Sequence, residues 1–110
     1  MPTFRYIMFL NPVPGREAEF NTWYEHVHLP DIAATGCFRS GERFEVMPSR
    51  HTPQAEHRYA SIYEVDGSDP EAALGKLVES FESGRMRMSD AMDMASSRPV
   101  LLRSMGVTLP

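Results

Sequence analysis

The 110-residue chain has a single cysteine, Cys37, and lacks an apolar run long enough to cross a membrane. One thiol cannot form an internal disulfide or a metal site built on paired thiolates, which fits a reducing compartment. The formal net charge is −4 and the basic residues form no stripe, which argues against nucleic acid as a partner. The glycines are scattered singly, so no loop is expected to cradle a nucleotide phosphate. We therefore expect a soluble, cytoplasmic protein without a signal peptide, a membrane partner or a nucleotide cofactor.

Hydrophobic residues make up 42% of the chain and charged residues 24%, which is the balance of a globular protein. The sequence shows no linker, so we predict a single domain over residues 1–110. Apolar periodicity and turn residues predict six elements, which are strands at 4–10, 38–47, 58–65 and 99–107 and helices at 16–28 and 70–83.

Local signals set the expected ends of the helices. Pro30 disfavours helical backbone at the residue before it, so the first helix is expected to stop or kink near His28. Asp69 is the expected N-cap of the second helix, and Gly84 its stop. The segment 85–97 fits either a short helix or a loop that wraps around the domain.

The predicted order is β-α-β-β-α-β, a ferredoxin-like α+β fold in which an antiparallel sheet carries both helices on one face. Two predicted strands have apolar side chains on both faces: Phe4, Tyr6, Met8 and Leu10 against Ile7 and Phe9, and Tyr59, Tyr63 and Val65 against Ala60 and Ile62. Strands with this pattern are covered on both sides, whereas two helices cover only one. We therefore expect a second sheet to cover the free face, most simply in a two-fold homodimer.

Two motifs in the first half of the chain resemble a known family. Residues 21–31 read Asn-Thr-Trp-Tyr-Glu-His-Val-His-Leu-Pro-Asp, and residues 36–38 and 43–44 read Gly-Cys-Phe and Arg-Phe. Together with the segments 59–65 and 87–90, these are similar to the EthD-like branch of the dimeric α+β barrel superfamily. The resemblance implies a homodimeric barrel with a small-molecule pocket between each sheet and its helices or loops. Its members include cofactor-free oxygenases, lactone isomerases, decarboxylases, cyclases, stress-response proteins and some haem binders, so the fold does not decide the reaction.

His28 is the first candidate for chemistry, because it matches the histidine of the family's His-x-Pro motif and imidazole exchanges protons near neutral pH. The alternative is a structural histidine that holds the bend at Pro30. Tyr24 lies one helical turn earlier on the same face, although an aromatic residue at that spacing is also typical of a core. Trp23 is expected to pack in the core or to form the floor of a pocket.

Three further residues are candidates for contact with a substrate. Arg43 matches an arginine of the family pattern, lies on the strand face opposite to Phe44, and can anchor a carboxylate or phenolate. A salt bridge is its alternative role. Asp31 can orient His28 or cap a turn, and Tyr63 is assigned to substrate binding on the third strand.

Metal binding is not expected. His26 and His28 are two residues apart on a helix and point about 200° apart, so they cannot chelate one ion together. The methionines at 86, 88, 92 and 94 suit either a core or a soft wall for an apolar ligand.

The sequence therefore predicts a cofactor-independent enzyme, of isomerase, lyase or oxygenase type, that acts on a small apolar, cyclic or aromatic metabolite. His28 would move a proton while Tyr24 or Arg43 stabilises an enolate or carboxylate. The first alternative is a non-catalytic binding or stress-response protein. The second is a haem protein with His28 as axial ligand.

Overall fold

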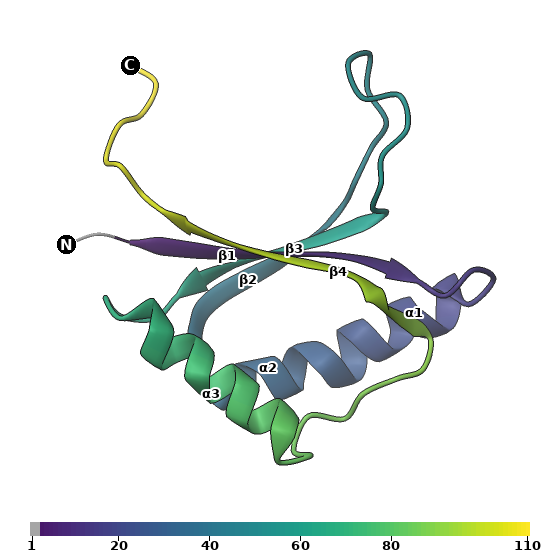
Figure 1. Cartoon of the computed structure of the whole chain (residues 1–110), viewed down its shortest axis with the longest axis horizontal. Coiled ribbons are helices and arrows are strands. Elements are labelled where there is room, and N and C mark those ends of the chain that lie inside the picture. The colour runs from purple at the N-terminus through teal and green to yellow at the C-terminus, as the bar shows by residue number, and fades with distance from the viewer. Residues whose placement is uncertain (1–2) are drawn as a thin grey trace.

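The computed structural model describes residues 3–110, which form one four-stranded antiparallel sheet with helices on one of its faces (Figure 1). The strand order is β2-β3-β1-β4. The elements are β1 (Phe4–Pro12), α1 (Glu17–Trp23), η1 (Tyr24–His28), α2 (Leu29–Thr35), β2 (Phe38–Glu45), β3 (Tyr59–Val65), α3 (Pro70–Glu82) and β4 (Met92–Arg103). This order and pairing confirm the ferredoxin-like α+β prediction. None of the helices in the described chain has both the length and the apolarity of a membrane span.

The first helical region does not end where the sequence suggested. We expected a stop or kink near His28, but the helix continues through Pro30 to Thr35 as α1, the π-helical turn η1 and α2. The backbone N–H of Leu29 bonds to the carbonyl of Tyr24, five residues earlier, which widens the turn just before the proline. Pro30 then occupies the first turn of α2, where it has no N–H to donate to the preceding turn.

A bulge in β2 changes which side chains share a face. Simple alternation puts Phe38 with Phe44 and opposite Arg43, but the register with β3 shifts between Phe38 and Ser40. A bulge inserts one residue, so the side chains beyond it exchange faces. Phe38 and Arg43 therefore both face the helices, while Phe44 faces the other side of the sheet.

The C-terminal half differs from the prediction mainly in β4. That strand begins at Met92, seven residues before the expected start at Pro99, and ends at Arg103. Residues 83–91, which we call the α3–β4 connection, form a loop. The predicted cap of α3 is confirmed, since the backbone N–H of Ala72 donates to Asp69 Oδ1 at 3.1 Å.

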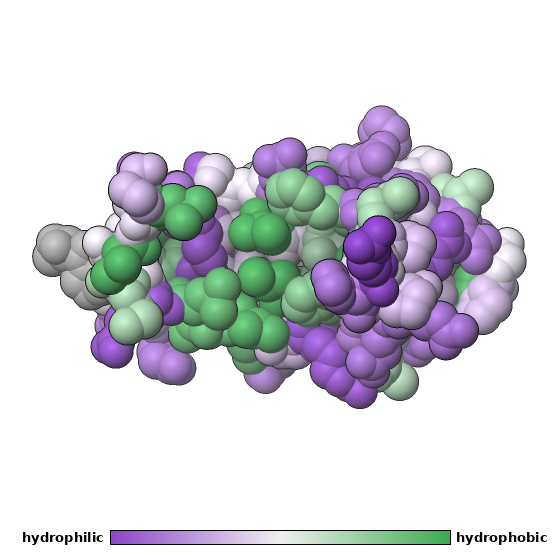
Figure 2. Space-filling model, turned by 90° about the horizontal axis from the view of Figure 1, so that it is seen from above, coloured by the Kyte–Doolittle hydropathy of each residue, from purple (hydrophilic) through white to green (hydrophobic). Residues whose placement is uncertain are grey.

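The two faces of the sheet have different surroundings. On the helix side, Leu10, Phe20 and Tyr24 are buried in one apolar cluster. On the other side, Figure 2 shows a broad apolar area that no helix covers. Strand register assigns Ile7, Phe9, Phe44, Ile62, Val100 and Leu102 to this free face. The C-terminal segment, residues 104–110, and the β2–β3 connection, residues 46–58, both extend beyond the sheet on this side (Figure 1).

Candidate functional site

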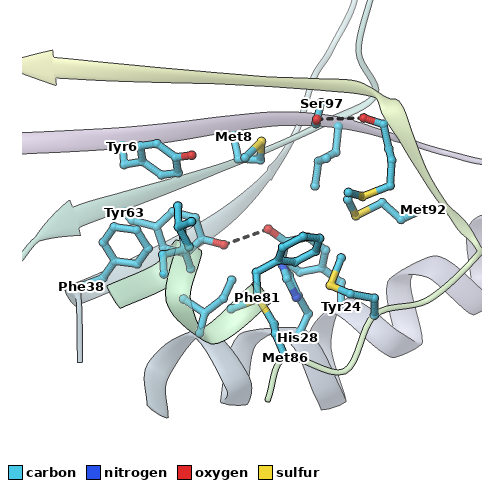
Figure 3. Close-up of a pocket in the computed structure, with 16 residues that line it drawn as sticks. Tyr6, Met8, Tyr24, His28, Phe38, Tyr63, Phe81, Met86, Met92 and Ser97 are labelled. Carbon is cyan, nitrogen blue, oxygen red and sulfur yellow. Dashed lines mark hydrogen bonds between the residues drawn. The ribbon is translucent and has the colours of Figure 1, made fainter. Parts of the chain in front are cut away.

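A cavity of about 250 Å³ lies between the helix side of the sheet and the helices (Figure 3). Most of its wall is apolar, and five methionines contribute to it: Met8, Met86, Met88, Met92 and Met94. Its polar lining residues are Tyr6, Tyr24, His28, Tyr63 and Ser97. No Lys, Arg, Asp or Glu of residues 3–110 lines it. All four methionines that the sequence offered as a soft wall are therefore at this cavity.

His28 reaches the cavity from the last position of the π turn η1. Its side chain is 9% exposed, its ring stacks on Trp23 with the centroids 4.5 Å apart, and the ring of Tyr24 meets it edge-on at 4.8 Å. Burial lowers the pKa of His28 from 6.5 to about 4, with a smaller opposing effect from the charge of Asp31. The imidazole is therefore neutral at physiological pH. Its Nδ1 is buried and has no hydrogen-bond partner in the described chain.

Three hydroxyl groups form a buried cluster beside His28. Tyr24 Oη lies 2.7 Å from Ser61 Oγ and 2.8 Å from Tyr63 Oη, and the bond between the two tyrosines is drawn in Figure 3. Burial is the main cause that raises the pKa of both Tyr24 and Tyr63, so both phenols remain protonated donors. Gly41 on β2 leaves room for this arrangement, because a Cβ there would lie 2.5 Å from Tyr63 Cδ1.

Arg43 lies behind Tyr24 and does not line the cavity. Its guanidinium sits over the Tyr24 ring at 4.4 Å, donates to Asn21 Oδ1 at 3.0 Å and pairs with Glu25 at 3.5 Å. In this position the phenol ring separates the cation from the cavity. The structure therefore brings together His28, Tyr24 and Tyr63, but not Arg43.

Asp31 also points away from the cavity, toward the α3–β4 connection. Its carboxylate accepts from Arg87 Nη2 at 2.7 Å, Arg87 Nε at 3.1 Å and the Arg87 backbone N–H at 2.9 Å. This arginine holds the pKa of Asp31 below its usual value. Trp23 contacts the same residue, because its indole N–H donates to the Arg87 carbonyl at 2.8 Å. Trp23 and Asp31 thus fix the connection that carries Met86 and Met88 into the cavity wall.

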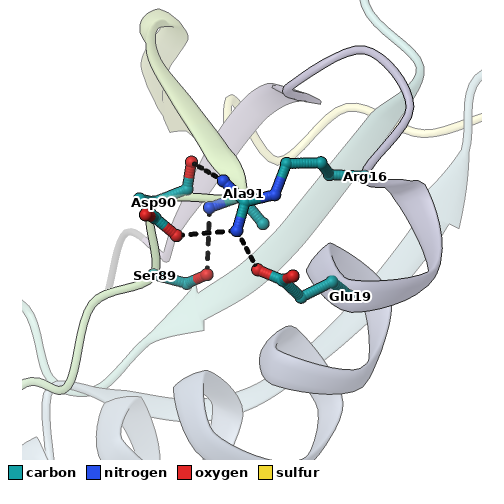
Figure 4. A network of polar contacts seen from close by, with 5 residues as sticks. All are labelled: Arg16, Glu19, Ser89, Asp90 and Ala91. Atoms are coloured by element: carbon teal, nitrogen blue, oxygen red, sulfur yellow. Dashed lines mark hydrogen bonds and ion pairs between the residues drawn. The ribbon is translucent and has the colours of Figure 1, made fainter.

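A second contact holds this connection near its C-terminal end (Figure 4). Arg16 pairs with Glu19 and with Asp90, whose Oδ1 lies 2.8 Å from Arg16 Nη2. The Arg16 guanidinium also donates to the Asp90 carbonyl at 3.2 Å. The connection is therefore bound to α1 just before β4 begins.

Sequence reasoning missed two residues of the site: Tyr6, which lines the cavity, and Ser61, which belongs to the hydroxyl cluster. Tyr6 had a usable signal, since it alternates with Met8 and Leu10 on the same face of β1. Ser61 had none, because its role depends on the position of Tyr24 on another element. Within residues 3–110, no three His, Cys, Asp or Glu side chains are grouped so that they could hold a metal ion.

The fold and cavity define a class: ferredoxin-like α+β proteins with a pocket of small-molecule size between sheet and helices. Residues 6–72 match the model of a family described as a domain of unknown function, DUF4286, and the chain belongs to that family. No curated protein matches the sequence significantly.

Solved structures show the same fold at low sequence identity. An ethyl tert-butyl ether D (EthD) family protein from Bacillus halodurans is similar with a TM-score of 0.62 and 12% identity over 94% of this chain and 99% of that one. HapK from Hahella chejuensis gives 0.55 and 12% over 100% and 98% of the two chains. An EthD-like protein from Ralstonia eutropha gives 0.54 and 15% over 96% and 94%. These likenesses confirm the EthD-like fold that the sequence predicted.

Proposed function

We propose that this protein is a small-molecule enzyme that transfers a proton at a carbon next to a carbonyl group of a cyclic or aromatic metabolite. The observation that carries the proposal is the position of His28, a neutral imidazole that lines an apolar cavity and whose Nδ1 has no hydrogen-bond partner in residues 3–110. Such a group accepts a proton, and a neighbouring phenol can stabilise the negative charge that results. The lone, buried Cys37 suits a cytoplasmic setting.

In this mechanism the imidazole of His28 takes the C–H proton, and the C–H electron pair becomes the double bond of an enolate. The carbonyl electrons move to the oxygen, which accepts a hydrogen bond from the hydroxyl of Tyr63. The proton then returns to the same or a different carbon, and no electrons are exchanged with another molecule. Enolisation of this kind is a common first step of isomerisation and of oxygenation without a cofactor, and loss of CO₂ from a β-keto acid leaves the same kind of enolate.

The proposal can be tested without the natural substrate. The probe 2-tetralone, a two-ring ketone, exchanges its C1 hydrogens for deuterium in D₂O, and proton NMR follows the loss of signal. We expect the protein to accelerate the exchange and His28→Gln to lose about 10²- to 10⁴-fold of that acceleration. Tyr59→Phe is the matched control, because the Tyr59 hydroxyl bonds to Asn21 at 3.2 Å and lies outside the cavity lining. Equal acceleration by wild type and His28→Gln would overturn the proposal.

A binding protein without turnover is the second candidate. The observation in its favour is the pKa of about 4 at His28, which makes the imidazole a weaker base than an exposed histidine. In that case 2-tetralone would bind in the cavity without accelerated exchange.

We also propose that the protein is a homodimer formed through the free face of the sheet. Phe44, Val100 and Leu102 on that face are 41%, 39% and 44% exposed. Beyond the sheet, Met105 and Leu109 of the C-terminal segment are almost fully exposed. An apolar area of this extent supports association, and a second copy offers the same surface under two-fold symmetry.

A further inference from the structure

The hydroxyl cluster has one more proton than its internal hydrogen bonds use. Tyr24, Ser61 and Tyr63 carry three O–H groups, and two hydrogen bonds connect them. Each bond uses one proton, so one O–H remains available. If Ser61 donates to Tyr24 and Tyr24 donates to Tyr63, the free donor is Tyr63, which lines the cavity, whereas Ser61 does not.

His28 supplies the complementary group on the same cavity. A neutral imidazole has one N–H and one acceptor nitrogen, and Nδ1 lacks a partner in the part of the chain that the structure describes. The cavity lining therefore includes one residue with an acceptor, His28, and one with a donor, Tyr63. A single hydroxyl on a ring satisfies both, because it donates one hydrogen bond and accepts another, whereas a ketone oxygen only accepts.

The rest of the wall restricts charge and size. A carboxylate placed between His28 and Tyr63, which are both buried, would lie there without a cation, because Arg43 lies behind the Tyr24 ring, and burying an unpaired charge is very costly. Sulfur atoms of methionine make favourable contacts with aromatic rings. A cavity of about 150 Å³ holds benzene, so about 250 Å³ corresponds to roughly two fused rings.

From these features we infer that the ligand is an uncharged two-ring phenol or enol whose single hydroxyl lies between His28 and Tyr63. The inference rests on the proposed function only in placing the ligand in this cavity. It also deepens that function, because a phenol is a stable analogue of the enol that proton transfer would form. A carboxylate-bearing ligand, which the sequence suggested for Arg43, is excluded by this assignment.

Isothermal titration calorimetry at about pH 7 tests the inference with three probes that share one two-ring core: 2-naphthol, 2-naphthoate and naphthalene. We expect 2-naphthol to bind at least about 100-fold more tightly than 2-naphthoate, because of the unpaired buried charge. Naphthalene, which lacks the two hydrogen bonds, should bind about tenfold more weakly than 2-naphthol. Tyr63→Phe should reduce the affinity for 2-naphthol toward that for naphthalene, and Tyr59→Phe should leave it unchanged.

Three results would overturn the inference: 2-naphthoate binding as tightly as 2-naphthol, naphthalene binding as tightly as 2-naphthol, or no binding of any probe. The wild-type comparison decides the question even if Tyr63→Phe does not fold. Selective binding of 2-naphthol without His28-dependent exchange of 2-tetralone would support this ligand class and refute the proposed reaction. His28-dependent exchange of 2-tetralone together with tight binding of 2-naphthoate would support the proposed reaction and refute this ligand class.

Discussion

At the residue scale, burial decides the chemistry of His28. The position at a helical turn with Tyr24 could be predicted from spacing alone, but the protonation state could not. A helix C-terminus favours the charged imidazole and burial favours the neutral one. The continuing helix removes the first effect, because His28 lies inside the helical region and not at its end. Burial then dominates, and the pKa falls to about 4.

This lowered pKa links stability to pH. In the unfolded chain His28 binds a proton below its ordinary value of 6.5, while in the folded protein it does so only below about 4. The unfolded state therefore binds more protons between these values, and stability falls as the pH drops from 6.5 toward 4 by on the order of 3 kcal/mol. We expect His28→Gln to lose this part of the pH dependence, as measured by urea unfolding at several pH values. An unchanged slope would mean that His28 titrates normally.

A second residue-scale prediction concerns Gly41. A Cβ there would lie 2.5 Å from Tyr63 Cδ1 and 2.8 Å from Cε1, so Gly41→Ala must displace the Tyr63 ring. Overpacking of this kind costs about 1–3 kcal/mol, and we expect that loss in chemical unfolding, together with weaker 2-naphthol binding. Gly75→Ala on α3 is the control, because its Cβ meets nothing within 4 Å. It should stabilise the protein by about 0.5–1 kcal/mol. Equal effects of the two substitutions would contradict the packing described here.

The candidate site was predictable to the extent that it depends on one element. Tyr24 and His28 share a helix face, and Tyr63 follows from strand alternation. The position of Arg43 depends on where α1 packs and on the bulge after Phe38, which is a feature of strand pairing. Sequence periodicity indicates neither of these features. It therefore could not predict that Arg43, the expected anchor for a carboxylate, lies behind Tyr24 and outside the cavity lining.

At the element scale, the π turn η1 and the α3–β4 connection together build the site. A π turn rotates the residues that follow it relative to a regular α-helix, and such turns are frequent at functional sites. Here it ends at His28, just before Pro30. The α3–β4 connection brings Met86 and Met88 to the wall, and it is held by Asp31 at Arg87 and by Arg16 at Asp90.

Loosening this connection should affect the cavity without unfolding the domain. Asp31→Asn weakens the contacts with Arg87, and we expect amide hydrogen exchange in residues 84–91 to rise roughly tenfold. The fluorescence of Trp23, the only tryptophan of the chain, should change as well, since its N–H donates to the Arg87 carbonyl. Arg85→Gln is the control, because Arg85 lies on the same connection and the substitution removes only its exposed ion pair with Glu79 of α3. Similar exchange in both variants would show that Asp31 does not hold the segment.

At the scale of the whole molecule, the order of elements could be predicted from the sequence because each element has a strong local signal. The extent of β4 could not be predicted, since Met92, Asp93 and Arg98 pair with β1 on the two sides of an irregularity in the register. The sequence also predicted the apolar side chains on both faces of β1 and β3. One set now lies against the helices and the cavity, and the other set forms the free face.

The homodimer proposal makes a prediction about that free face. Val100 and Leu101 are both 39% exposed and adjacent on β4, but their side chains point to opposite faces of the sheet. We expect sedimentation equilibrium at micromolar concentration to show a dimer for the wild type and for Leu101→Glu, and a monomer for Val100→Glu. A monomeric wild type would refute the proposal, and a Val100→Glu dimer would place the interface elsewhere.

The central claim, that a buried neutral His28 acts as a base in this cavity, is tested most directly by the pH dependence of 2-tetralone exchange. The measured quantity is the rate with wild-type protein minus the rate with His28→Gln, at constant ionic strength. With a pKa of about 4, the base form is complete above about pH 5, so the difference should be flat to pH 8 and fall as the pH approaches 4. A difference that rises through about pH 6.5 would show an ordinary solvated histidine, and no difference at any pH would show that His28 is not the base.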